Sequence, residues 1–591
     1  MADPLALQAP QPPPVGRPFY YLDNFRTALH SLQQRYGDLL SDAERDFLTT
    51  FSRLPPLSAA LLVRMIGRKG DLFRSSRLRY AEIGCPHAAA EPLMQVGWLQ
   101  ADPLLSPAEL GRLLRRAELA AVVASPGCMQ LRKDELLRTL MLQRSAARTW
   151  SKWWCATDEQ VYRLCVQPLS QALRLIFFGN FRQTWAEYVL TDLGIFRYET
   201  LPGDAMTRAF QSRAQIEIFL QMYRCQQQLE AGDDPQVLLA MLPEPLSADD
   251  WLEARRGKLE FEIAQRCERL GLLEQAITLY RRCPYSGARV RLARVLERAQ
   301  RFAEALQITE AHCERAHGEQ AHGEQPHGEQ PPREFERQQL ARIGLRLRRR
   351  SGAPAARPSP APLWPRLRLS LPCTERPARL EQSCADLLAR ADAPVFYVES
   401  RLLNSLFGLL FWDAIFAPLP GAFFHEFQAA PADLFASNFA SRRATQIARC
   451  FAHLESTGYR EIIEHHYHAR QDVQSPFVCW GLLSEALLDL ALECIAPDHL
   501  RLYFTRLLQD LQMNHTGLPD LIQLVPGTRS YRLIEVKGPG DRLQDNQRRW
   551  LHFCVAHALP AQVLHVGWQG RAAAGRAAVA DAGGVEHLGA L

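Results

Sequence analysis

Two short β-prone runs near the C-terminus flank a turn: GLPDLIQLV (517–525), PGTRS (526–530) and YRLIEVKG (531–538). The first run is apolar after Asp520 and the second alternates, which is typical of strands. The Pro-Gly segment between them is turn chemistry, so the stretch predicts a β-hairpin. Asp520 begins the first strand, and Glu535 and Lys537 lie two residues apart on the second. Side chains with that spacing project from the same face of a strand.

This hairpin would bring two carboxylates and one ammonium together at the edge of a small sheet. Magnesium prefers carboxylate oxygens and takes water or substrate phosphate as further ligands, and a lysine beside it can orient or deprotonate the attacking water. Lysine is rare in this arginine-rich chain and occurs only at Lys69, Lys133, Lys152, Lys258 and Lys537. The alternative is an exposed hairpin with a wet Glu and Lys. The interruption of an apolar strand by charges favours the functional interpretation.

The length of the chain, 591 residues, predicts several domains rather than one. A net charge of only +5 means that any nucleic-acid surface must consist of local patches. The 14 cysteines show no CxxC pairing, which predicts no zinc site and no disulfide framework, as in a reducing compartment. There is no signal peptide and no apolar run of the ~18 residues that span a membrane. A cytoplasmic, nucleoid-associated protein is expected.

The N-terminal part predicts a disordered tail over 1–16 and a basic DNA-binding domain over 17–100. Basic residues interleave with aromatic and apolar ones between positions 64 and 80, as on a helical or winged-helix-like domain that contacts phosphates. The candidate DNA contacts are Arg64, Arg68, Lys69, Arg74 and Arg77. The alternative is a solvated basic face.

Residues 101–145 predict a helical hairpin similar to a SAP module. Ser106 and Glu109 have the spacing of a capping box at the start of the first helix. Lys133, at the start of the second helix, is a further candidate DNA contact, and the alternative is an ordinary helical hairpin. Residues 146–315 predict helices and a helical repeat layer, because two similar helix starts recur there. Their spacing is shorter than the ~34 residues of tetratricopeptide repeats, so the repeats are degenerate.

Residues 316–393 predict a low-complexity insertion and a linker, because His-Gly-Glu-Gln recurs there and a Pro-rich stretch follows. Residues 394–591, which contain the hairpin, predict an α/β domain. Glu399 precedes a buried helix and is a candidate third acid, the alternative being a charge that complements the helix dipole. After the hairpin, a helix carries Gln547, which can face the site, and Arg548, which can face phosphate.

Pro519-Asp520 and Glu535-Val536-Lys537 resemble the signature of the PD-(D/E)xK nuclease superfamily. The longer motifs GLPD (517–520), EVKGP (535–539), DRL (541–543) and QRRW (547–550) resemble the virus-type replication-repair nuclease (VRR-NUC) domain. YYLDNF (20–25), the SAP-like segment, the repeat layer and LLFWD (409–413) extend the resemblance to the Fanconi-associated nuclease family. The expected fold is thus a mainly α multidomain chain that ends in a restriction-endonuclease-like α/β domain.

The resemblance implies a 5′-flap endonuclease and 5′-to-3′ exonuclease that acts in interstrand-crosslink repair with Mg²⁺ or Mn²⁺. Lys537, Glu535, Asp520 and Glu399 would be catalytic, and Glu399, Asp520, Glu535 and the Val536 carbonyl would hold one or two ions. The ubiquitin-binding zinc finger of eukaryotic members is missing, and a monomeric bacterial protein is expected. The rival hypotheses are a Holliday-junction resolvase, which needs a symmetric dimer, and a non-catalytic scaffold for branched DNA.

Overall fold

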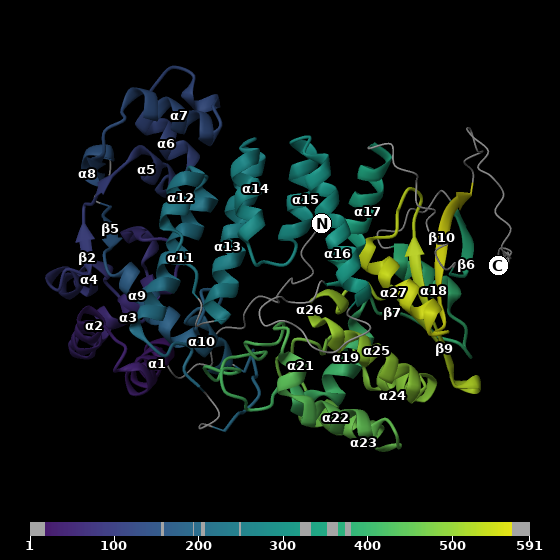
Figure 1. The fold of residues 1–591 in the computed structure, drawn as a ribbon. Coiled ribbons are helices and arrows are strands. Elements are labelled where there is room, and N and C mark those ends of the chain that lie inside the picture. Colours follow the sequence, from purple (N-terminus) through teal and green to yellow (C-terminus); the bar gives the residue numbers. More distant parts are fainter. Residues whose placement is uncertain are drawn as a thin grey trace. The chain divides into compact units, whose positions relative to one another are not determined.

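The computed structural model describes residues 18–154, 159–192, 194–202, 207–246, 250–318, 333–350, 364–372 and 380–569. They cluster into two compact units. The first unit contains the described parts of Met1–Tyr198, Met206–Glu217 and Phe424–Phe427, and the second contains the rest. Most elements are helices, and the C-terminal part adds a five-stranded sheet (Figure 1). None of the described helices is both long and apolar enough to cross a bilayer.

The first unit begins with a helical domain that carries a small antiparallel sheet. Its elements are α1 (Tyr20–Tyr36), α2 (Asp42–Arg53), α3 (Pro56–Ile66), β1 (Leu72–Arg74), α4 (Pro86–Gln95), β2 (Leu99–Ala101) and β5 (Val161–Leu164). The strand order is β1-β5-β2, so the central strand comes from well beyond the boundary predicted at residue 100. The chain between β2 and β5 is an insertion into this sheet, which a linear division of the sequence does not foresee.

The inserted module is the SAP-like segment. It contains β3 (Leu104–Leu105), α5 (Pro107–Leu113), α6 (Arg116–Val123), α7 (Lys133–Gln143), β4 (Arg148–Thr149) and α8 (Trp150–Trp153). The predicted capping box is confirmed, because the Ser106 N–H donates to the Glu109 carboxylate at 2.8 Å and Ser106 caps the Glu109 N–H. Trp150 and Trp153 lie in the core of this module. Two further helices, α9 (Gln167–Phe178) and α10 (Ala186–Asp192), also belong to the unit.

A helical repeat layer follows. Its helices are α11 (Arg213–Ala231), α12 (Pro235–Met241), α13 (Asp250–Arg269), α14 (Leu273–Arg282), α15 (Ala288–Arg298), α16 (Phe302–Gly318) and α17 (Glu334–Arg350). Each helix from α12 to α17 packs against the next one described. The His-Gly-Glu-Gln recurrence lies largely outside the described residues. α17 falls in the range predicted as insertion and linker, yet Leu340, Ile343 and Leu347 bury one face of it, so it extends the layer.

The nuclease domain is built on a five-stranded sheet with the order β6-β10-β9-β8-β7. The strands are β6 (Arg366–Pro372), β7 (Val395–Tyr397), β8 (Leu521–Val525), β9 (Ser530–Lys537) and β10 (Ala561–Gln569). β8 and β9 form the predicted antiparallel hairpin, whereas β9, β10 and β6 run parallel. β6 also lies in the range predicted as a linker. It forms a strand of the sheet because its leucines pack beneath the sheet while its arginines face solvent.

The sheet separates two apolar cores. The helices around it are α18 (Leu380–Leu388), α19 (Arg401–Leu410), α20 (Trp412–Ile415), α21 (Phe439–Arg442), α22 (Ala444–His453), α23 (Gly458–Ala469), α24 (Glu485–Cys494), α25 (Pro497–Gln509), α26 (Leu511–Asn514) and α27 (Asp545–Ala556). Tyr531 and Leu533 of β9 face the larger core, and Ile534 and Val536 face the smaller one. By the same alternation Glu535 and Lys537 share a face, as predicted.

Candidate active site

Asp520 is fixed at the point where three strands meet. Its backbone carbonyl accepts the N–H groups of Val398 (2.8 Å) and Glu399 (3.0 Å), at the end of β7. Its side-chain Oδ2 accepts the N–H of Val536 on β9 at 2.9 Å. The residue therefore ties the edge strand to the middle of the sheet, and its second carboxylate oxygen stays available to a ligand.

Glu535 and Lys537 form an ion pair with 2.7 Å between Oε1 and Nζ. Glu535 is 0 % exposed and Lys537 is 9 % exposed. Within the described part of the chain, neither oxygen of Glu535 accepts a hydrogen bond of good geometry, so the ammonium of Lys537 is its one close partner. A buried carboxylate with so few donors is costly unless a cation completes its surroundings.

Asp520 and Glu535 hold their protons more tightly than ordinary carboxyl groups do. Burial raises the pKa of Asp520 to about 6, and the negative charges of Glu381 and Glu399 add to the effect. The pKa of Glu535 is raised to about 8, by burial first and then by the charge of Asp520, while Lys537 opposes the shift. Perturbed, mutually coupled acids of this kind are concentrated at functional sites.

Glu399 lies beside these residues on a strained turn. Both Glu399 (φ +27°) and Ser400 (φ +64°) adopt left-handed backbone conformations, which are unfavourable for residues with a side chain. The turn is held in place because Ser400 Oγ accepts the Leu518 N–H at 3.2 Å and the Tyr397 hydroxyl donates to the Glu399 carboxylate. These hydrogen bonds hold the strained turn between β7 and α19 and so keep Glu399 next to the GLPD loop.

The donor set fits a hard divalent cation. Glu535 offers two buried oxygens without hydrogen-bond donors, and Asp520 offers one oxygen beyond its bond to Val536. Among the residues that the structure describes, no group of three His, Cys, Asp or Glu side chains is close enough to enclose a metal by itself. An open site of this kind suits Mg²⁺-like ions, which keep water and take substrate phosphate as ligands.

Glu381 is a further acid that sequence reasoning missed. It lies on α18, whose residue Cys384 belongs to the smaller core beneath the sheet, and its charge acts on Asp520 and on Tyr397. The sequence places its segment in the predicted linker, because the only local signal, a short apolar run after a proline-rich stretch, does not indicate the sheet against which α18 packs.

Gly517 sets the approach of the GLPD loop to α27. Its φ of +90° is in the left-handed region, and a Cβ atom there would lie 2.8 Å from the backbone carbon of Asn546. Only glycine allows the loop to pass so close to the start of α27. On that helix Gln547 accepts the Gln544 N–H (2.8 Å) as part of a capping box, and Arg548 is exposed.

The predicted DNA contacts of the first unit have different environments. Arg74 is 8 % exposed and is held by Glu118 at 2.8 Å and Glu159 at 2.5 Å. The expectation of a phosphate contact therefore does not hold for Arg74, whose guanidinium joins the helical domain to the inserted module. Arg64 is half-buried, stacks 3.9 Å over Tyr21 and pairs with Glu82. Arg68, Lys69, Arg77 and Lys133 are exposed, as DNA contacts require.

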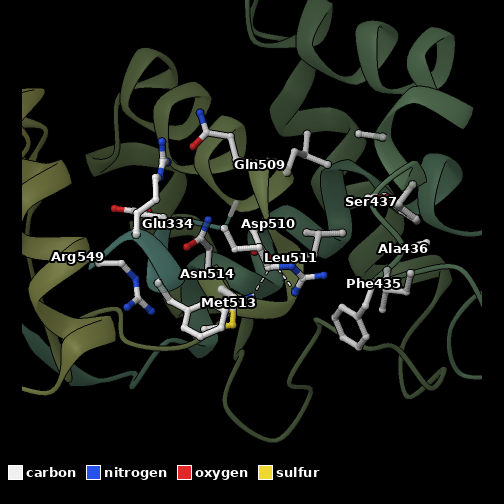
Figure 2. Close-up of a pocket in the computed structure, with 17 residues that line it drawn as sticks. Glu334, Phe435, Ala436, Ser437, Gln509, Asp510, Leu511, Met513, Asn514 and Arg549 are labelled. Atoms are coloured by element: carbon white, nitrogen blue, oxygen red, sulfur yellow. Dashed lines mark hydrogen bonds and ion pairs between the residues drawn. The ribbon is translucent and has the colours of Figure 1, made fainter. Parts of the chain in front are cut away.

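A cavity of about 430 Å³ lies in the second unit among α17, α25, α26 and residues 434–440 (Figure 2). Arg549 reaches it from α27, is 7 % exposed and donates to Gln338 at 3.1 Å. Figure 2 shows Glu334 and Arg549 on one side of the cavity and Phe435 on the other. None of the predicted site residues lines it, so it is separate from the cluster of carboxylates.

The sequence matches three domain families: "FAN1, HTH domain" over residues 19–100, "Fanconi anemia-associated nuclease SAP domain" over 104–153, and "VRR-NUC domain" over 454–568. A Fanconi-associated nuclease 1 homolog from Pseudomonas aeruginosa is 45% identical over 566 residues, which cover 95% of this chain and 98% of the relative. The chain belongs to the Fanconi-associated nuclease family. The family, the fold class and the nuclease activity predicted from the sequence are thereby confirmed.

Other relatives match more weakly or over less of the chain. A homolog from Schizosaccharomyces pombe is 31% identical over 173 residues, or 29% of this chain and 24% of the relative. Among solved structures, paFAN1 bound to 5′-flap DNA with a two-nucleotide flap has a TM-score of 0.87 and 45% identity, covering 95% of this chain and 100% of that one. Like other nucleases with a VRR-NUC domain, this member of the Fanconi-associated nuclease family is metal-dependent.

Proposed function

We propose that this nuclease recognises branched DNA, cuts 5′ flaps and digests from 5′ ends, in the repair of interstrand crosslinks. The observation that carries the proposal is the buried carboxylate of Glu535, which among the described residues has Lys537 as its one close partner and Asp520 beside it. Two similar solved structures, both of paFAN1 bound to 5′-flap DNA, support the choice of substrate.

Asp520, Glu535 and the Val536 carbonyl would hold Mg²⁺ or Mn²⁺, and Glu399 would hold a second ion or its waters. A divalent ion bound there would polarise the scissile phosphate and lower the pKa of a nearby water. Hydrolysis adds a water oxygen to phosphorus and breaks one P–O ester bond. Lys537 acts on this step directly, because its ammonium can donate a hydrogen bond to the attacking water or to the phosphate oxygen on which charge develops.

Three features of the protein's own residues prepare the site. The Val536 N–H orients Asp520, the ion pair orients Lys537, and the Tyr397 hydroxyl orients Glu399. Burial of Glu535 and Lys537 limits competing water, which strengthens their electrostatic action on a bound phosphate. The exposed Arg68, Lys69, Arg77 and Lys133 would hold duplex arms through phosphates, with little preference for sequence.

The decisive experiment compares cleavage of an end-labelled 5′-flap duplex, a 3′-flap duplex and a four-way junction with Mg²⁺, Mn²⁺ or EDTA. The proposal expects metal-dependent cutting near the junction of the 5′ flap and none in EDTA. Symmetric cutting of the four-way junction would instead identify a resolvase. Tight binding without cutting under either metal would identify a non-catalytic scaffold.

A further inference from the structure

Leucine and arginine alternate along the edge strand β6, so that one face of the strand is apolar and the other is basic. Leu367, Leu369 and Leu371 pack on the smaller core, whereas Arg366 and Arg368 are exposed on the opposite face. That opposite face is the one that carries the catalytic residues of β9, because β6, β10 and β9 are parallel and in register. Strand partners in a parallel sheet project their side chains to the same side.

The register places one basic side chain after another in a single row. Lys537 on β9 is the partner of His565 on β10, and His565 is the partner of Arg368 on β6. In the preceding row Glu535 is the partner of Val563, and Val563 is the partner of Arg366. A row of Lys537, His565 and Arg368 therefore runs from the catalytic lysine across β10 to the edge of the sheet.

Lys537 is paired with Glu535, but the two arginines at the outer end of the row face no acid within the described part of the chain. Arg366 and Arg368 have no ion pair or side-chain hydrogen bond there. His565 lies between them and Lys537, and its pKa is lowered by partial burial and by the charges of Arg366, Arg368 and Lys537, so near pH 7 it contributes a neutral hydrogen-bonding group and the arginines carry the charge. Elsewhere in the same unit exposed arginines are commonly neutralised, as Arg342 is by Asp545 (2.7 Å) and Arg346 is by Glu297 (2.5 Å). A protein surface without counter-charges attracts an external polyanion.

Helix α27 extends the row with one more cation. Its residue His552 packs edge-on to Trp364, just before β6, with 5.1 Å between ring centroids, so this side of the helix faces the edge of the sheet. Arg548 lies one turn earlier on the same side and is exposed. α27 covers the catalytic face of the sheet, because Trp550 and Leu551 share a core with Leu533 and Val563.

We propose that Arg366, Arg368, His565 and Arg548 form a track that binds the sugar–phosphate backbone of the substrate DNA next to the scissile phosphate. The inference rests on the proposed nuclease function and adds the surface that guides the strand to Lys537. Two strand spacings of about 4.8 Å separate Lys537 from Arg368, and that ~10 Å matches the axial rise of about three nucleotides at 3.4 Å each. Guanidinium groups bind phosphate oxygens in pairs, which suits this role better than ammonium groups do.

Charged residues on an edge strand also prevent aggregation, and that role would need no register with the active site. The two roles are separated by the double variant Arg366→Gln/Arg368→Gln, measured as intact full-length chain. Affinity for a 5′-flap duplex is measured in EDTA between 50 and 300 mM salt by fluorescence anisotropy. Each lost phosphate contact reduces the slope of log K against log salt by about 0.9, so the double variant is expected to lose about 2 in slope.

The matched control is Arg532→Gln, which removes an exposed arginine from the opposite face of β9, at the far end of the strand. The control is expected to keep the wild-type slope. In cleavage assays the double variant should raise KM at least tenfold and leave kcat at saturation unchanged, and Arg368→Lys should keep the slope but bind more weakly than wild type.

The outcomes distinguish failure of the track from failure of the enzyme. If wild-type protein cleaves the flap and the double variant keeps its slope and KM, the track is refuted and the proposed function stands. A lower melting temperature or aggregation with an unchanged slope would assign these arginines to edge protection. Absence of cleavage by the wild-type chain with either metal would refute the proposed function itself.

Discussion

The carboxylate of Glu535 lies 2.7 Å from the ammonium of Lys537, and both groups are buried in the nuclease domain. The pair is asymmetric in function. Lys537 can turn toward a bound phosphate or water, whereas Glu535 then depends on a divalent ion for compensation. This relationship predicts different effects of replacement: a loss of cleavage rate for Lys537, and a change in metal binding and in the pH dependence of stability for Glu535.

Replacing Lys537 with glutamine is expected to lower kcat for flap cleavage by about 10²–10³-fold, the usual cost of losing one donor to the developing charge. Affinity for the flap in EDTA should stay at the wild-type level, because a buried side chain contributes little to long-range attraction of DNA. Single-turnover cleavage and anisotropy measure the two quantities. An equal loss of rate in Lys258→Gln, which changes a lysine of the repeat layer, would show that the effect is not specific to the site.

The raised pKa values predict how the metal-free protein responds to pH. The pKa of Glu535 is about 8 in the folded protein, against an ordinary value of 4.5. Between those values the folded state binds more protons than the unfolded state, so the free energy of unfolding falls as pH rises. Glu535→Gln removes this dependence and should exceed the wild type in stability at pH 8, by an amount on the order of a few kcal/mol.

Thermal unfolding in EDTA at a series of pH values from 5 to 8.5 measures this difference. The two melting temperatures should be close at pH 5 and diverge as pH rises, with the variant higher. Excess metal should stabilise only the wild type, because Glu535→Gln lacks the carboxylate ligand. If melting temperature changes with pH in the same way for the wild type and the variant, Glu535 is not the carboxyl group whose pKa is raised.

Two functions of Asp520 in the proposed site can be tested separately: one oxygen accepts the Val536 N–H, and the other would bind the metal ion. Asparagine keeps an oxygen that accepts the Val536 N–H, whereas alanine leaves this N–H without a partner, which costs about 1–3 kcal/mol. Asp520→Asn and Asp520→Ala should both abolish cleavage and leave flap binding intact, and only Asp520→Ala should also lower the melting temperature. Cleavage at the wild-type rate by either variant would disprove the site assignment.

How far the sequence predicts this structure depends on whether the signal is local. The hairpin around Asp520, Glu535 and Lys537 is encoded by alternation and a turn within one short stretch, and the structure has it as predicted. The sequence does not predict β6, because a parallel edge strand is defined by its partner strand, which lies almost two hundred residues away. It does not predict α18 either, because this helix packs on the same distant sheet. The prediction that Arg74 contacts DNA is wrong for the same reason, since Glu118 and Glu159 neutralise it from distant positions in the sequence.

Gly517 is the residue whose replacement tests the geometry of the site without touching its chemistry. Gly517→Ala forces a side chain into a backbone with φ of +90° and against Asn546, so the GLPD loop and α27 must move apart. We expect kcat to fall at least tenfold and the melting temperature to fall by a few degrees, since the strain costs about 1–3 kcal/mol. The matched control is Gly527→Ala in the hairpin turn, where an added Cβ meets open space and φ is not positive. Wild-type activity in Gly517→Ala, or an equal loss in Gly527→Ala, would show that the close approach of the loop to α27 does not position Asp520.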